Sequence, residues 1–384
     1  MDSAEGVPHS RRLPLSAAVS ALVLVGVLGV VSVPVAVGGV GPGSPSGLVA
    51  QWARTHGLGG LVSWLEGARH APSAPVPGAA FGSRSAAPTP SSAVTPSAGR
   101  ATTVSVPQGP VAPDPLGVPA GLTPLPGEGQ WRSLVVVDGR TAARVAQVRP
   151  DAIHTSSIVS VVWMDPSLLS FSLHAGTQVP GAVPGVESQL VGAERAAVWA
   201  TFNSGFQMKD ARGGYWQNGR SVVPLVSGAA SMVLSSDGRL SVEAWPGGAP
   251  PAGVVAVRQN LSLLIDHGVE VPSVHSTVVS DWGRTVSNAP YVWRSGIGVR
   301  ADGTVVQASG PSLTAATLVH ALLSAGAQTA MELDINKDWT SFITYDQPGA
   351  VPHRLTADQV PSATRYLSPS ARDFVAVLPR GVRG

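Results

Sequence analysis

Apolar positions divide this 384-residue chain into stretches of different character. Near the N-terminus, residues 15–37 form one uncharged run dominated by aliphatic side chains. Residues 71–127 follow later and show no apolar periodicity. From Trp131 onward, short apolar runs alternate with turn residues, which is the pattern of a packed domain rich in strands.

The first apolar run predicts a transmembrane helix. Its 23 residues, Leu15–Val37, are long enough at about 1.5 Å per residue to cross a hydrocarbon core of about 30 Å. Arg11 and Arg12 precede the run, so we expect residues 1–14 in the cytoplasm and the remainder outside. A cleaved signal peptide is the alternative, although its apolar core is normally only about 7–15 residues. The sequence therefore predicts an uncleaved signal anchor, a single pass through the cell membrane and an extracellular C-terminal domain.

Two segments separate this anchor from the packed region. Residues 38–70 combine tryptophans with leucines and predict an amphipathic juxtamembrane segment, for which a loosely ordered spacer is the alternative. Residues 71–128 predict a disordered linker rich in proline, serine and alanine. Thirteen prolines fall between positions 71 and 127, and such a composition buries too little apolar surface to offset the entropy of ordering. The linker would carry the following domain away from the membrane.

Residues 129–384 are long enough for one sizeable core. Asp237-Gly238 and Asp302-Gly303 each lie between two apolar runs and predict β-hairpins. The other predicted strands cover residues 134–137, 158–163, 169–173, 197–202, 254–257, 261–265, 329–335 and 340–344.

Helices are few in this pattern. Residues 314–325 carry leucines and valine at helical spacing, and Gly326 follows where a left-handed cap is expected. A second helix is predicted near residues 368–375. The fold class is therefore α+β, with a strand-rich mixed sheet and a few flanking helices.

Composition and charge narrow the function classes. The chain has no cysteine, which excludes disulfides, thiolate metal sites and cysteine nucleophiles. Its net charge is only +2 and its arginines are scattered, so we expect no nucleic-acid partner. The histidines lack metal-ligand spacing, and we expect no cofactor; scattered carboxylates leave an oxygen-ligand Ca²⁺ site as an unsupported alternative.

One candidate for chemistry is the pair Glu332 and Asp334. Side chains alternate along a strand, so these two carboxylates and Asn336 would share one face. Their Cα atoms would lie about 6.6–7 Å apart along the strand, a separation at which paired carboxylates can divide acid and base work. A strand with one solvated face gives the same pattern.

Three polar breaks between apolar runs are further candidates. In Asn203-Ser204-Gly205 the glycine permits close backbone approach to a ligand, whereas an ordinary turn is the alternative. Arg294 precedes small residues, and its guanidinium could hold a phosphate or carboxylate; a structural ion pair is the alternative. The segment Arg258–Asn260 makes a similar break.

Together these pieces resemble the phosphodiester glycosidase family, the group of the mammalian uncovering enzyme, which removes N-acetylglucosamine from a phosphodiester. Residues 200–206 are similar to the family's A-x-F-N-G-G-F turn, and residues 294–298 to its R-T/S-A-I-G. Residues 331–334, after the predicted helix and glycine, look like part of its G-x-x-x-A-M-x-L-D-G-G element. The resemblance covers roughly residues 156–377 and is closest to an actinobacterial, membrane-anchored subgroup. This chain departs from the family at residues 335–338, where Ile-Asn-Lys-Asp replaces glycines and serine.

The resemblance implies an extracytoplasmic hydrolase acting on sugar-1-phosphodiesters, with a cell-wall or capsular phosphoglycan as partner. Asp334 and Glu332 would be the catalytic carboxylates, and Arg294 would hold the phosphate. The residues expected to bind substrate are Asn203, Ser204, Gly205, Arg258, Asn260 and Trp293. A non-catalytic glycan-binding module on the same fold is the main alternative, and a scaffold for another protein is a third.

Overall fold

The computed structural model describes residues 110, 113–276, 278–285, 289–347 and 350–382. The predicted anchor, the juxtamembrane segment and most of the linker lie outside the described residues. In the part of the chain that is described, no helix is both long and apolar enough to cross a bilayer.

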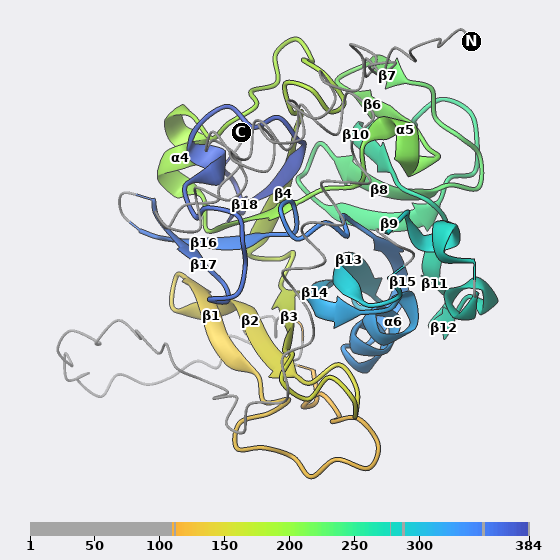
Figure 1. The fold of residues 1–384 in the computed structure, drawn as a ribbon. Helices are drawn as coiled ribbons and strands as arrows, with labels where there is room; N and C mark the ends of the chain where they lie inside the picture. Colours follow the sequence, from red (N-terminus) through yellow and green to blue (C-terminus); the bar gives the residue numbers. More distant parts are fainter. Residues whose placement is uncertain (1–109, 111–112, 277, 286–288, 348–349, 383–384) are drawn as a thin grey trace, which may run out of the picture. The chain divides into compact units, whose positions relative to one another are not determined.

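An eight-stranded sheet forms the largest layer of the domain (Figure 1). Its strand order is β1-β2-β3-β14-β13-β15-β11-β12. These strands are β1 (Arg132–Val137), β2 (Arg140–Val148), β3 (Val159–Met164), β11 (Leu263–Asp266), β12 (Val269–Glu270), β13 (Val292–Arg300), β14 (Val305–Leu313) and β15 (Ala327–Glu332).

Two five-stranded sheets complete the architecture, in the orders β7-β6-β10-β8-β9 and β17-β16-β5-β18-β4. The first contains β6 (Tyr215–Gln217), β7 (Arg220–Val223), β8 (Ala230–Ser235), β9 (Leu240–Ala244) and β10 (Val254–Gln259). The second contains β4 (Leu169–His174), β5 (Ala200–Asn203), β16 (Phe342–Asp346), β17 (Val351–Arg354) and β18 (Phe374–Pro379).

Neighbouring strands of all three sheets run antiparallel. The two predicted hairpins form as expected, because Asp237-Gly238 joins β8 to β9 and Asp302-Gly303 joins β13 to β14. The α+β class is confirmed, but the prediction of a mixed sheet is wrong. Only the isolated bridges Gly176–Pro180 and Val179–Arg372 are parallel among the described residues.

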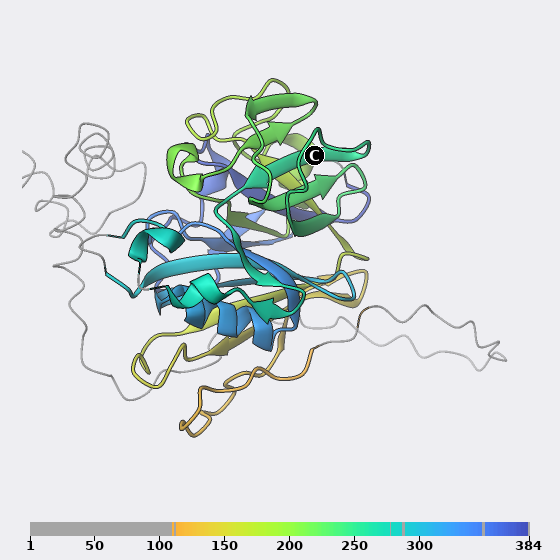
Figure 2. The same ribbon diagram turned by 90° about the vertical axis from the view of Figure 1, so that its right-hand side faces the viewer.

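Helices cover the edges and one face of the sheets. The helix predicted at residues 314–325 is α6 (Ala315–Ser324), followed by Gly326 at φ 87°. Figure 2 shows α6 lying along one face of the eight-stranded sheet, on the side away from the five-stranded sheets. The other helical segments are short: α4 (Gly192–Ala197), α5 (Met208–Ala211) and the 3₁₀ turns η3 (Pro272–His275), η4 (Val279–Trp282) and η6 (Arg365–Leu367).

A capping box starts α6. The Thr314 hydroxyl accepts a hydrogen bond from the Thr317 amide at 3.1 Å, and the Thr317 hydroxyl accepts one from the Thr314 amide at 2.8 Å. Thr314→Ala should therefore lower the free energy of unfolding by about 1 kcal/mol, measured by urea denaturation. Thr314→Ser keeps the hydroxyl and should stay close to wild type. Equal losses in the two variants would show that the hydroxyl is not the source of the stability.

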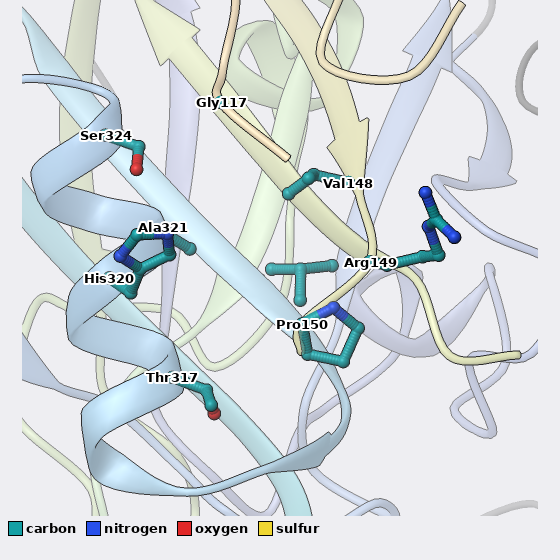
Figure 3. Close-up of a pocket in the computed structure, with 9 residues that line it drawn as sticks. Gly117, Val148, Arg149, Pro150, Thr317, His320, Ala321 and Ser324 are labelled. Carbon is teal, nitrogen blue, oxygen red and sulfur yellow. The ribbon is translucent and has the colours of Figure 1, made fainter. Parts of the chain in front are cut away.

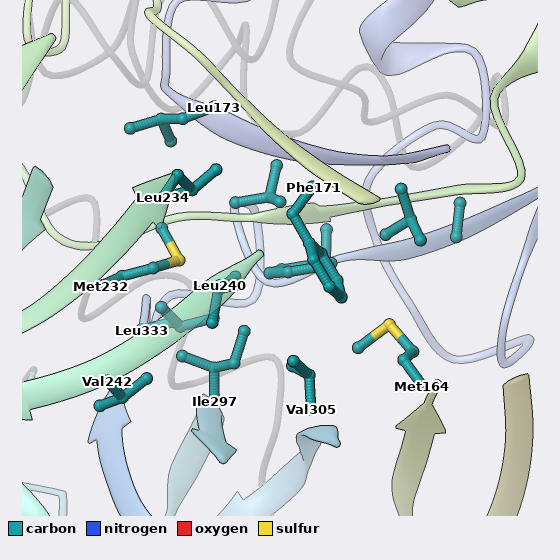
Figure 4. Packing of buried hydrophobic residues seen from close by; sticks show 14 of the residues in the cluster. Met164, Phe171, Leu173, Met232, Leu234, Leu240, Val242, Ile297, Val305 and Leu333 are labelled. Atoms are coloured by element: carbon teal, nitrogen blue, oxygen red, sulfur yellow. The ribbon is translucent and has the colours of Figure 1, made fainter. Parts of the chain in front are cut away.

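One apolar core joins all three sheets. It includes Val162 of β3, Met232 of β8 and Phe202 of β5, each fully buried. Figure 4 shows Phe171 near the centre of this cluster, with Leu240 on one side and Met164 on the other. A second core lies between α6 and the other face of the eight-stranded sheet. Because the sheets share one core, the strand ends that surround it are held in fixed relative positions.

The C-terminal part of the chain differs from expectation. The predicted helix near residues 368–375 is wrong, because Phe374 begins β18, which lies between β5 and β4. Residues 374–378 of β18 are all buried, so the run shows no strand alternation and resembles a buried helix in sequence.

The described end of the predicted linker packs on the domain. Leu116 is buried and its amide donates to the Gly129 carbonyl at 2.9 Å. Glu128 is also buried, and its carboxylate lies 2.8 Å from Arg149 Nη2. Ordered packing thus begins before Trp131.

Candidate functional site

Strand ends from all three sheets meet at one place. Asn203 ends β5, Asn260 follows β10, and Glu332 ends β15. Because β13 runs antiparallel to β15, Arg294 near its start reaches the same edge. Likewise β18 pairs Phe374 with Asn203, which brings the residues just before β18 to this point. The chain order of the strands therefore concentrates polar side chains where the sheets converge.

Arg294 and Glu332 form a buried ion pair. Arg294 Nη1 lies 2.5 Å from Glu332 Oε1, and the side chains are 4% and 0% exposed. The same guanidinium donates to two carbonyls, from Nε to Leu313 at 3.0 Å and from Nη1 to Trp282 at 2.8 Å. Glu332 Oε2 is buried without a hydrogen-bond partner. Acceptors within the protein thus hold Arg294. Of the two roles considered for this arginine, anion binding and a structural ion pair, the structure shows the ion pair.

Asp334 pairs with an arginine that the sequence did not single out. Arg372 Nη2 donates to Asp334 Oδ2 at 2.6 Å and to the Gly205 carbonyl at 2.8 Å. The other carboxylate oxygen of Asp334 accepts from the Asn336 amide at 2.9 Å. Asp334 is 4% exposed, whereas Glu332 is fully buried. Asp334 is therefore the carboxylate of the two that lies closer to solvent.

Arg258 and Asp373 form the most deeply buried pair. Arg258 Nε lies 2.6 Å from Asp373 Oδ2, and both side chains are 0% exposed. The guanidinium also donates to the carbonyls of Phe206 and Gln259. A side chain with no exposed surface does not reach a ligand, so this pair fixes the loop that carries Asn203, Ser204 and Gly205.

Two asparagines connect the sheets within the site. Asn203 Nδ2 donates to Ser295 Oγ at 2.9 Å, and Asn203 Oδ1 accepts from the Ser341 amide at 2.9 Å. Ser295 Oγ in turn donates to the Asp334 carbonyl at 2.8 Å. Asn260 accepts from the Phe206 amide at 3.1 Å and donates to the Glu332 carbonyl at 2.9 Å. Both amides therefore hold backbone that carries the two carboxylates.

Gly205 is required by close packing. A Cβ atom at this position would lie 3.1 Å from the Arg258 guanidinium and 3.1 Å from the Asn260 side chain. The neighbouring Ser204 hydroxyl is buried without a hydrogen-bond partner. The glycine in the Asn-Ser-Gly turn thus allows the turn to contact side chains of β10.

Side-chain hydrogen bonds close the turn after Asp334. Asn336 Oδ1 accepts from the Asp338 amide at 2.9 Å, as Asp334 Oδ1 does from Asn336. These side-chain turns close the loop without any residue from 335 to 339 at positive φ. The predicted strand 329–335 is therefore too long: β15 ends at Glu332, although the Leu333 amide still donates to the Ser295 carbonyl at 2.7 Å. Asn336 lies beyond the strand, not on a shared strand face.

Burial dominates the electrostatics of the two carboxyl groups. It raises the pKa of Glu332 to about 7, against the attraction of Arg294 and with a further upward contribution from Asp334. Burial also raises the pKa of Asp334, opposed mainly by Arg372. Carboxyl groups with raised pKa values are typical of sites that handle protons, and structural networks also produce them.

This pKa predicts a pH-dependent stability. The pKa of Glu332 lies above its ordinary value of 4.5, so the folded chain binds this proton more tightly than the unfolded chain. The stabilisation is complete below about pH 4.5 and is lost as the pH rises through 7. Relative to Glu332→Gln, the free energy of unfolding of the wild type should fall by up to about 3 kcal/mol between pH 4.5 and 8.

Urea denaturation across this pH range measures the difference. Glu243→Gln is the matched control, because Glu243 is exposed on β9 and its replacement should change stability by less than about 0.5 kcal/mol at any pH. A pH-independent difference between wild type and Glu332→Gln would contradict the raised pKa.

The structure brings together most of the residues selected from the sequence. Asn203, Ser204, Gly205, Arg258, Asn260, Arg294, Glu332 and Asp334 all belong to the buried network, and Trp293 lies half-buried beside Arg294 on β13. Sequence reasoning missed Arg372 and Asp373, because both fall in the wrongly predicted helix. It also missed Ser295 as the link between Asn203 and Asp334, although Ser295 was part of the arginine motif.

Two further observations concern other parts of the described structure. Among the described residues, no three or more histidine, aspartate or glutamate side chains are grouped as a metal site would need. Figure 3 shows a pocket between α6 and the ends of β2 and β3, with His320, Thr317 and Arg149 among its lining residues. None of the residues selected from the sequence lines it.

Comparison with known proteins gives weak likenesses of fold. No protein-family model and no curated protein sequence matches the chain. The catalytic domain of zebrafish N-acetylglucosamine-1-phosphodiester alpha-N-acetylglucosaminidase, auto-inhibited by its pro-peptide, is 12% identical with a TM-score of 0.41, over 65% of this chain and 87% of that one. A hypothetical protein from Synechocystis is 13% identical (TM-score 0.40, 63% of each chain). A putative exported protein from Burkholderia pseudomallei is 13% identical (TM-score 0.34, 59% and 75%).

Proposed function

We propose that this protein is a membrane-anchored extracytoplasmic hydrolase that cleaves sugar-1-phosphodiesters in a cell-wall or capsular glycan. One observation carries the proposal: Asn203, Arg294 and the neighbouring carboxylates Glu332 and Asp334 come from three distant parts of the chain and belong to one hydrogen-bonded network where three sheets meet. The motifs that contain them follow the order found in the phosphodiester glycosidases that the chain resembles.

The reaction adds water across the bond between sugar C1 and the ester oxygen. That bond breaks, the hydroxyl of water joins C1, and the ester oxygen leaves with the phosphate as a phosphomonoester, which takes the remaining proton of the water or releases it to solvent. A phosphomonoester is stable as an anion, so the leaving group needs little protonation. Catalysis therefore depends mainly on stabilising positive charge at C1 and negative charge on the phosphate.

Asp334 has the better position of the two carboxylates for the sugar. It keeps some exposed surface, and Arg372 and the Asn336 amide hold both of its oxygens. We assign it to C1, as nucleophile or as a charge that stabilises an oxocarbenium-like state. Glu332 is fully buried, so we assign it to the positioning of Arg294. Asn203 would then orient the turn that faces the sugar.

Binding without turnover is the second candidate. The observation that favours it is that each carboxylate already has an arginine partner, which lowers its reactivity toward carbon. Both candidates predict affinity for a sugar phosphodiester, and only the hydrolase predicts products.

The deciding experiment incubates the full-length protein with a panel of sugar-1-phosphodiesters and quantifies free reducing sugar and phosphomonoester. We expect both products in equal amounts from at least one substrate. Saturable binding of the same compounds with no product over the course of hours would reject the hydrolase in favour of the binding module.

The membrane attachment is tested separately. We expect the full-length chain in the membrane fraction of expressing cells and a variant lacking residues 15–37 in the soluble fraction. Recovery of both proteins in the same fraction would contradict the anchor.

A further inference from the structure

Two buried arginines, Arg365 and Arg372, contact the ring of the same tryptophan. The guanidinium carbon of Arg372 lies 4.9 Å from the ring centroid of Trp339, and that of Arg365 lies 4.4 Å from it. Trp339 itself is half-buried. Flat guanidinium groups stack favourably on such rings and keep their edges for hydrogen bonding.

These two arginines have donors that the protein does not use. The Nε atoms of Arg365 and Arg372 are buried and have no hydrogen-bond partner. Elsewhere on the same guanidinium, Arg365 Nη1 donates a hydrogen bond to the Asp338 carbonyl at 2.8 Å. A buried donor on a charged group is destabilising when it lacks an acceptor, so an acceptor from outside the chain would be favourable here.

Arg365 and Arg372 are more exposed to solvent than the other two arginines of the network. Arg365 and Arg372 are 8% and 7% exposed, whereas Arg294 is 3% and Arg258 is 0% exposed. Arg294 is also held by Glu332 and by two carbonyls. Arg365 and Arg372 are therefore the most exposed of the four arginines.

The formal charges of the network favour an added anion. Its four arginines (258, 294, 365 and 372) face three buried carboxylates (Glu332, Asp334 and Asp373). The adjoining half-buried pair of Lys337 and Asp338 adds no net charge, which leaves one positive charge in excess when all are ionised. The pKa of Arg365 is lowered by burial and by the neighbouring charge of Arg372, the direction expected for two cations in one place. A phosphate ester would supply the missing negative charge.

We propose that Arg365 and Arg372, stacked on Trp339, form the oxyanion-binding part of the site and hold the phosphate group of the ester. The proposal deepens the function proposed above and rests on it for the sugar, but not for the phosphate. It moves the phosphate-binding role from Arg294 to the arginine pair. Since Arg372 also contacts Asp334, the phosphate oxygens would lie near the carboxylate assigned to C1.

Calorimetric titration of the full-length protein tests this assignment, with inorganic phosphate, a sugar 1-phosphate and its methyl diester as probes. Arg365→Met, which keeps much of the length of the side chain without the charge, should weaken binding of all three probes at least tenfold. Arg365→Lys keeps the charge without the fork and should weaken binding by a smaller factor. The matched control is Arg239→Met, an exposed arginine on β9's hairpin, which should bind like wild type.

Thermal melting confirms that each variant is folded before titration. If Arg365→Met does not fold, Trp339→Leu takes its place, because loss of the stacking ring should also weaken binding several-fold. Wild-type affinity in a folded Arg365→Met or Trp339→Leu protein would overturn the proposal, as would the absence of phosphate binding by the wild type at millimolar concentration.

The two proposals fail in different ways. Phosphate binding that depends on Arg365, without cleavage of any diester, would reject the hydrolase and support the oxyanion site. Cleavage that is unchanged in Arg365→Met would support the hydrolase and reject the oxyanion site.

Discussion

Arg258→Met should lower the free energy of unfolding by about 3–5 kcal/mol, the largest stability change expected from any single substitution in the network. The substitution leaves the Asp373 carboxylate buried with no opposite charge at 2.6 Å. It also removes the donors to the Phe206 and Gln259 carbonyls. Urea denaturation followed by circular dichroism measures the loss.

An exposed pair provides the control for this prediction. Arg239 lies 3.1 Å from Asp237, with side chains 70% and 48% exposed, and Arg239→Met should cost no more than about 1 kcal/mol. The double variant Arg258→Met/Asp373→Leu should recover part of the loss, because it leaves no buried charge unpaired. A loss below about 1 kcal/mol in Arg258→Met would show that this pair does not hold the site together.

Asp334→Asn should reduce the turnover number on a cleavable diester by about 10²–10⁴-fold. Asparagine keeps the shape and its oxygen can still accept from Arg372, but its NH2 group then faces the Asn336 amide, so we expect some loss of stability as well. What is lost is the negative charge beside C1. Steady-state kinetics and a melting curve on the same preparation separate loss of chemistry from loss of structure.

Asp302→Asn is the control for this substitution. Asp302 lies in the hairpin turn between β13 and β14, with its side chain 38% exposed, and its loss should leave turnover close to wild type. Turnover within threefold of wild type in Asp334→Asn would remove this carboxylate from the mechanism.

Local signals in the sequence predicted local structure well. Asp-Gly turns identified the hairpins β8–β9 and β13–β14, and the spacing of apolar residues with Gly326 identified α6. The sequence did not show which strands belong to which of the three sheets, because paired strands such as β5 and β18 are far apart in the chain. The helix predicted near residues 368–375 overlaps the start of β18, whose buried residues 374–378 show no alternation.

Contacts between distant parts of the chain also decide which site residues the sequence could predict. Asn203, Arg294 and Asp334 stand at breaks in apolar runs, where polarity is visible in the sequence. Arg372 and Arg365 can be recognised as site residues only from tertiary contacts. Arg372 pairs with Asp334, and Arg365 stacks on the Trp339 ring. The spacing of Glu332 and Asp334 identified two carboxylates, but only the structure shows that each has its own arginine.

The position of the broken bond tests the central claim most directly. A sugar-1-phosphodiester is cleaved by the wild-type protein in ¹⁸O-labelled water, and both products are analysed by mass spectrometry. A glycosidase that uses Asp334 at C1 places the label on the anomeric hydroxyl of the sugar and none in the phosphomonoester. Label in the phosphate would mean that the P–O bond breaks and would contradict the assignment of the site.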